Sequence, residues 1–131
     1  LNLYKGINLL LQNLQSKTNL AIATNSWDFF ARKMLNHCNI GHYFDPVVGA
    51  NTYGAPKPDP KMLHKLLETL KIDPKSAVLV GDSLKDEYAA ESANIPFIYV
   101  GWGYGIYDPK TPYVANSSEE LNTLLLDFIS R

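Results

Sequence analysis

The chain has one cysteine, Cys38, among its 131 residues, so no disulfide can form within it. It has no apolar run near the roughly 20 residues that span a bilayer, and no pattern typical of a secretory signal. Its charges nearly cancel, with 12 Lys and Arg against 13 Asp and Glu. A disulfide scaffold, a membrane-spanning protein and a basic nucleic-acid or membrane binder are therefore excluded. We predict a cytoplasmic protein.

Two common nucleotide-binding motifs are also missing. No Gly-x-Gly-x-x-Gly turn follows the first predicted strand, and no Gly-Lys-Ser/Thr sequence of the Walker type occurs. What remains is an ordinary globular composition, 46% hydrophobic and 19% charged. That composition predicts one domain over residues 1–131 with a hydrophobic core. Helical spacing places Cys38 with Trp27, Phe30 and Met34, which predicts that Cys38 is a buried small side chain.

Helical and strand patterns alternate along the chain. Apolar residues at helical spacing predict helices near 6–17, 26–38, 60–71 and 83–93, and a last one after Ser117. Short β-branched runs predict strands near 20–24, 47–50, 77–81, 96–100 and 113–115. Residues 51–60 are predicted to form a loop because three prolines occur within five positions. The order predicts a Rossmann-like, three-layer α/β sandwich with a mostly parallel sheet.

Conspicuous polar residues follow three of the predicted strands. Thr24 and Asn25 end the first, Lys57 lies in the loop beyond the second, and Asp82 and Asp86 follow the third. The carboxyl ends of parallel strands share one edge of a sheet, where ligands bind. Hydroxyl and N–H donors hold phosphate oxygens, an ammonium neutralises their charge, and carboxylates hold Mg²⁺. The set therefore predicts a phosphate site with a divalent metal.

Each group also has a plainer interpretation. Asn25 or Ser26 can cap the helix that follows, and Lys57 can be a solvated side chain between prolines. Asp82 and Ser83 can likewise cap the next helix. The sequence order and the shared sheet edge favour the phosphate site.

These motifs resemble the haloacid dehalogenase superfamily, in particular its phosphoglycolate-phosphatase-like branch. Residues 20–25 resemble its second motif, a strand ending in Thr or Ser. Residues 57–60, Lys-Pro-Asp-Pro, resemble its third, and residues 81–90, which begin Gly-Asp-Ser-x-x-Asp, resemble its fourth. Residues 3–7 resemble the return into the core after the family's cap, and 101–105 the loop after its last core strand. The match covers essentially the whole chain.

The resemblance implies Mg²⁺-dependent hydrolysis of a small phosphomonoester through an aspartyl phosphate. By this comparison Asp82 is a metal ligand, and Asp86 either supports the metal through water or orients Lys57. The Thr24 hydroxyl and the Asn25 backbone N–H would bind the phosphoryl group. Lys57 would stabilise the nucleophile and the phosphoryl charge.

The family's first motif, Asp-x-Asp on its central first strand, does not occur in this sequence. We therefore expect no phosphatase turnover from these 131 residues alone. We also expect a gap between the strands that end at Thr24 and Gly81. Another chain or copy fills that gap, or the strands pair across it, or the chain is part of a longer protein that supplies the motif and the cap. Because the chain begins at Leu1, we expect the last.

Two functional alternatives stay open. The chain can be a non-catalytic phosphate- or metal-binding or interaction module derived from the same fold. The parent protein can also carry out phosphomutase or dehalogenase chemistry. In this family the cap selects the leaving group, so the sequence does not specify the substrate.

Overall fold

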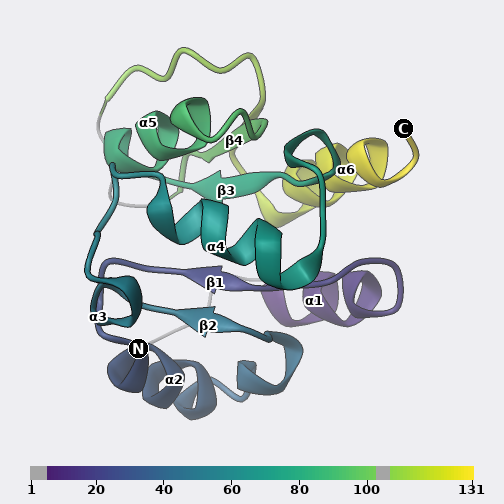
Figure 1. Cartoon of the computed structure of the whole chain (residues 1–131). Helices are drawn as coiled ribbons and strands as arrows, with labels where there is room; N and C mark the ends of the chain where they lie inside the picture. Colours follow the sequence, from purple (N-terminus) through teal and green to yellow (C-terminus); the bar gives the residue numbers. More distant parts are fainter. Residues whose placement is uncertain (1–5, 103–106) are drawn as a thin grey trace.

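The computed structural model describes residues 6–102 and 107–131 (Figure 1). Most of the predicted elements are present, with shorter strands than expected. The helices are α1 (Ile7–Gln15), α2 (Asp28–His37), α3 (Ala50–Tyr53), α4 (Lys61–Leu70), α5 (Leu84–Ser92) and α6 (Ser118–Ile129), with 3-10 turns η1 (Gly41–Tyr43) and η2 (Pro74–Ser76). The strands are β1 (Ile22–Ala23), β2 (Val47–Val48), β3 (Leu79–Gly81), β4 (Phe97–Val100) and β5 (Val114–Ala115). None of the helices in these ranges is long and apolar enough to cross a membrane.

The strands form two separate parallel sheets. One contains β1 and β2, with Ile22 opposite Val47, and the other has the order β3-β4-β5. Figure 1 draws the arrows of β1 and β3 pointing the same way, and no strand of the described ranges lies between them. The parallel α/β prediction is confirmed, including the missing central strand. The alternative that β1 and β3 pair directly across the gap is wrong.

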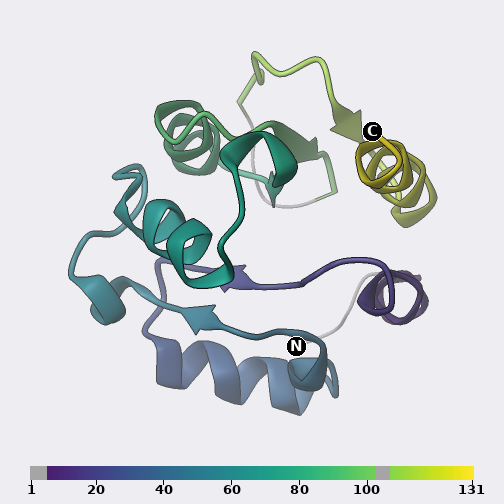
Figure 2. The same cartoon turned by 45° about the vertical axis from the view of Figure 1, so that its right-hand side comes forward.

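The two sheets are held together by helices rather than by strand pairing. Met62 and Leu66 of α4 pack with Val48 of the first sheet, while Leu63 packs with Phe97 and Tyr99 of the second. A further cluster joins α1 and α6 to Ile40, Tyr43, Ile98 and Ala115. Figure 2 shows α4 on one side of the two sheets and α1 and α6 on the other side. The result is a three-layer sandwich with a divided middle layer.

The two strands that face the gap, β1 and β3, each pair with a neighbouring strand along one edge only. The N–H groups of Ile22 and Thr24 donate to β2 and its flanking residue, and that of Leu79 donates to Pro96 beside β4. Alternate backbone groups of a strand point to opposite edges, so the other edges of β1 and β3 face the gap. Val80 of β3 is 38% exposed, whereas Ile98 of β4, which pairs on both sides, is fully buried.

The prediction of a loop over 51–60 is wrong in its first residues, which belong to α3. Thr52 caps the N-terminal end of this short helix through both its backbone and its side chain. Its N–H donates to the Gly49 carbonyl at 3.1 Å, and its hydroxyl accepts from the Gly49 N–H at 2.9 Å. The prolines begin later, at Pro56, and do not reach this turn.

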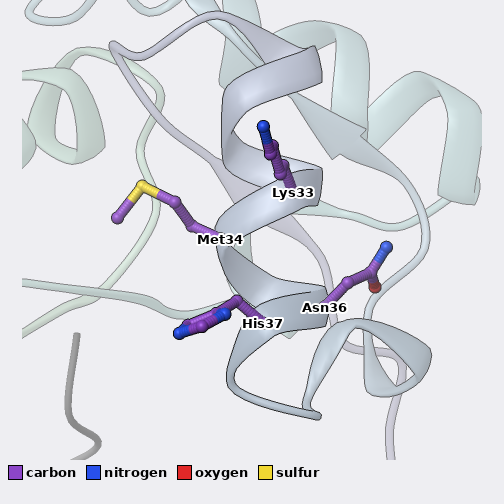
Figure 3. A pocket seen from close by; sticks show the side chains of 4 residues that line it. All are labelled: Lys33, Met34, Asn36 and His37. Carbon is purple, nitrogen blue, oxygen red and sulfur yellow. The ribbon is translucent and has the colours of Figure 1, made fainter.

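The apolar stripe predicted on the second helix is only partly buried. Ala31 is buried and Cys38 is half-buried, but Trp27 and Phe30 remain 62% and 56% exposed. Met34 is also exposed; Figure 3 shows it beside His37 in a surface pocket that Lys33 and Asn36 complete. A sheet of two strands is too narrow to cover the whole stripe.

Candidate active site

Lys57 is the centre of the predicted polar edge. Its ammonium donates to the Ala23 carbonyl at 2.7 Å and forms an ion pair with Asp86 at 2.5 Å. The two charged side chains are only 10% and 11% exposed. The interpretation of Lys57 as a solvated side chain is therefore wrong. One side chain connects the end of β1, the proline loop and the first turn of α5.

Asp86 is fixed by its own helix start. The Ser83 hydroxyl donates to its Oδ2 at 2.8 Å, and the Asp86 backbone N–H donates back to that hydroxyl at 3.2 Å. Ser83 thus caps α5. The remaining oxygen, Oδ1, contacts Lys57. Of the two roles considered for Asp86, this geometry favours orienting Lys57.

Gly81 is required where β3 meets this carboxylate. A Cβ at this position would lie 2.5 Å from Oδ2 of Asp86. We predict that Gly81→Ala lowers the free energy of unfolding by about 1–3 kcal/mol, the usual cost of overpacking. Urea denaturation measures the loss. In an Asp86→Gly background, which removes the Oδ2, Cγ and Cβ atoms that all lie within 2.8 Å of the added Cβ, the same change is expected to cost less than about 0.5 kcal/mol; an undiminished cost would place the conflict in the backbone instead.

Thr24 and Asn25 lie at the end of β1, and neither caps α2. The Thr24 hydroxyl accepts from the Ser26 N–H at 3.1 Å, which leaves its hydrogen for another acceptor. The Asn25 side-chain amide bonds to the backbone of Lys57. The N-cap of α2 is Trp27, without a side-chain cap bond. The interpretation that Asn25 or Ser26 caps this helix is wrong, since the helix starts one residue later than Ser26 allows and the Asn25 amide is engaged elsewhere.

Asp82 directly follows Gly81 at the end of β3 and is half-buried. Asp86, the partner of Lys57, follows Asp82 by four residues and lies in the first turn of α5. Within 6–102 and 107–131, no three His, Cys, Asp or Glu side chains gather closely enough to hold a metal. Any metal at this edge would therefore draw few ligands from this part of the chain.

A second polar cluster, which was not predicted from the sequence, joins the start of α2 to α3 just beyond the end of β1. Asp28 at the start of α2 accepts from Asn51 at 3.2 Å and Thr52 at 3.0 Å, and its N–H donates to Asn51 at 2.8 Å. These bonds, first from Asn51 and then from Thr52, lower the pKa of Asp28. The signal available in the sequence was a pair of polar residues directly after the second strand.

Glu87, beside Asp86, is buried and holds the segment after β4. It accepts from the backbone N–H groups of Lys110 and Thr111 at 2.8–3.2 Å. Burial, and then the charge of Glu87, raise the pKa of the nearby Tyr107 phenol. The unfolded chain therefore loses the Tyr107 proton first, near pH 10, while the folded chain retains it.

This difference predicts an alkaline loss of stability. The free energy of unfolding is expected to fall as the pH rises above about 10, because only the unfolded state releases the proton there. Tyr107→Phe should flatten the decline, as urea midpoints between pH 8 and 11 would show. Tyr88→Phe is the control, because Tyr88 is 42% exposed. It should leave the slope of stability against pH unchanged. Equal slopes in all three proteins would contradict the prediction.

Comparison with known proteins identifies relatives of the chain. The chain is 36% identical over 110 residues to the phosphoglycolate phosphatase of Aquifex aeolicus, covering 83% of the chain and 52% of the relative. It is 32% identical over 130 residues to that of Vibrio cholerae, covering 95% and 56%. The chain thus spans about half the length of these curated relatives.

Solved structures give the same result for the fold. The crystal structure of a predicted phosphoglycolate phosphatase from Haemophilus somnus 129pt superposes with a TM-score of 0.88 at 25% identity, covering 95% of this chain and 57% of that one. Residues 1–100 match the family model described as haloacid dehalogenase-like hydrolase. The chain therefore belongs to the haloacid dehalogenase-like hydrolases.

Proposed function

We propose that the chain supplies the phosphate- and metal-binding half of a Mg²⁺-dependent phosphomonoester hydrolase that acts in the cytoplasm. The observation that carries this proposal is the buried contact of Lys57 with Asp86 and the Ala23 carbonyl. It places an ammonium at the carboxyl edge of the divided sheet, where an anionic ligand would bind. The names of the two bacterial relatives favour a small phosphorylated substrate of the phosphoglycolate type.

Each residue at the edge has a role in this proposal. The Thr24 hydroxyl and the backbone N–H of Asn25, just before α2, would hold phosphoryl oxygens. Lys57 would neutralise charge that develops on the phosphoryl group. Asp86, already engaged by Lys57, would keep that ammonium in place.

Asp82 would hold the Mg²⁺. This ion commonly binds through one or two carboxylates and completes its shell with water and substrate phosphate, so a single carboxylate at the edge fits it. When bound, the metal supplies positive charge to the phosphoryl oxygens.

The nucleophile would come from outside these 131 residues. A further segment, from the same protein or another chain, would place a strand between β1 and β3. Its aspartate would attack phosphorus and displace the substrate's alcohol oxygen, which leaves as the alcohol, and water would then cleave the aspartyl phosphate to inorganic phosphate and the free carboxylate. Among the described residues, no strand pairs with either of the two edges that face the gap.

A chimera tests the proposal directly. The N-terminal half of the Aquifex aeolicus relative is placed before Leu1, and hydrolysis of p-nitrophenyl phosphate is measured with and without Mg²⁺. We expect turnover that requires Mg²⁺ in the chimera and none in the 131-residue chain alone. Asp82→Asn should lower the chimera's kcat/KM by about 10²-fold or more. Asp127→Asn, at an exposed position of α6, is the control and should leave kcat/KM unchanged.

Three outcomes would contradict the proposal. Normal turnover by the 131-residue chain would remove the need for a second segment. Unchanged Mg²⁺ dependence in Asp82→Asn would remove the metal role of that residue. A folded chimera that binds phosphate without hydrolysing it would favour the alternative of a non-catalytic binding module.

A further inference from the structure

Asn25 connects two loops of the candidate site through its side chain. Its Nδ2 donates to the Lys57 carbonyl at 2.9 Å, and its Oδ1 accepts from the Lys57 N–H at 2.8 Å. We propose that Asn25 is a positioning residue that holds Lys57 in its working place. The part that concerns catalysis rests on the proposed function, whereas the part that concerns position does not.

The local sequence explains why an amide is needed. Lys57 lies between Pro56 and Pro58, and proline has no backbone N–H. The Lys57 N–H is therefore the one backbone donor that these three residues offer. Asn has a donor and an acceptor side by side, so it can satisfy the N–H and the C=O of a single residue together. A carboxylate of the same shape would lose the donor, and an alanine would lose both groups.

Both the backbone and the side-chain ammonium of Lys57 are consequently held by one short segment, residues 23–25. Asn25 binds its backbone, and the carbonyl of Ala23, two residues earlier, binds its ammonium. Asp86 accepts a second ammonium hydrogen. An ammonium has three hydrogens, so one is left for an incoming anion once these two contacts are made. A side chain restrained in this way loses little freedom when that anion binds.

The segment that carries Asn25 is itself anchored on its other side. The Ser26 carbonyl accepts from the Ala50 N–H at 2.9 Å, and Asp28 is bonded to Asn51 and Thr52. Gly49 allows this approach, because a Cβ there would collide with the backbone of residues 26–28. The position of Asn25 is thus set by α2 and α3, so loss of its amide would release the proline loop rather than move β1.

Hydrogen exchange on the 131-residue chain tests the positional part. In the parent chain we expect the Lys57 amide to be protected about 10²-fold. Asn25→Ala is expected to remove most of that protection by allowing local opening. Asn25→Asp keeps an acceptor for this N–H and should retain the protection. Asn13→Ala, at an exposed position of α1, is the control.

The amides of Leu66, inside α4, and Ile98, in β4, belong to the core and report whether each variant is folded. They are expected to exchange as in the parent chain. Unchanged protection of the Lys57 amide in a folded Asn25→Ala variant would overturn the proposal. Equal loss at Lys57, Leu66 and Ile98 would also overturn it, because the effect would then be general unfolding.

Kinetics of the chimera test the catalytic part. Asn25→Ala is expected to lower kcat by about 10–10²-fold, the scale of a small misplacement of a catalytic group. The KM should stay within about twofold, since the backbone N–H of residue 25 is kept. A rise in KM alone, or an unchanged kcat, would overturn the catalytic part. If the chimera has no activity at all, the proposed function fails, while the exchange experiment still decides the positional part.

Discussion

Replacing Lys57 by Met is expected to lower the free energy of unfolding by about 3–5 kcal/mol, the usual cost of leaving a buried charge without its partner. The Lys57 and Asp86 side chains are 10% and 11% exposed, so little water would replace the lost ammonium. Ser83 alone would remain to hydrogen-bond the carboxylate. Single domains have total stabilities of about 5–15 kcal/mol, so this loss would bring the chain close to unfolding at room temperature. Urea denaturation followed by circular dichroism measures it.

Two comparisons make this prediction specific. Lys65→Met removes an exposed ion pair with Glu68, whose atoms are 3.6 Å apart, and should cost at most about 0.5 kcal/mol. Adding Asp86→Asn to Lys57→Met removes the unpaired charge and should restore about half of the loss or more. A cost below about 1 kcal/mol for Lys57→Met, or no recovery in the double variant, would show that the pair is not effectively buried.

Parallel-strand geometry explains why the sequence could predict the convergence of Thr24, Lys57 and Asp86. Strands that alternate with helices bring their carboxyl ends to one edge, whatever their spacing in the chain. The chemical types of the residues then suggested a phosphate. Neither step requires knowledge of any side-chain rotamer, and for this reason both could be made before the structure was known.

Side-chain partners far apart in the sequence were beyond this reasoning. Asn25 follows a strand and precedes a helix, and in that position an N-cap is the ordinary expectation. Its actual partner, the Lys57 backbone, is 32 residues away. The orientation of Asp86 was also undecided, because a carboxylate one turn into a helix can serve either a metal or an ammonium. Only the three-dimensional arrangement, with Ser83 holding one oxygen, favours the ammonium.

The exposed stripe on α2 has a different cause. Helical periodicity correctly showed which side chains share a face, but it contains no information on how wide a surface that face meets. Trp27, Phe30 and Met34 remain exposed because α2 packs over a sheet of two strands. The same division of the sheet that leaves this stripe open also leaves the facing edges of β1 and β3 unpaired.

A strand placed in this gap is expected to protect both edges at once. By alternation, the amides of Ala21, Ala23, Val78 and Val80 point away from the strands that pair with β1 and β3. In the 131-residue chain they should exchange close to the rates of an unstructured peptide. In the chimera, where a strand bonds to both sheets, all four should slow by about 10³-fold or more, as amides in a central strand do.

A synthetic strand distinguishes pairing from a general gain in stability. The peptide has six residues, an apolar first half followed by Asp-x-Asp. Added at 100 times its Kd, it should stabilise the chain by about 2.7 kcal/mol. The same peptide with N-methyl groups at alternate residues cannot donate along one edge and should protect only one sheet. If the unmodified peptide protects the amides of one strand edge only, the peptide extends a single sheet. The gap would then not be a site for one central strand, and the proposed source of the nucleophile would fail with it.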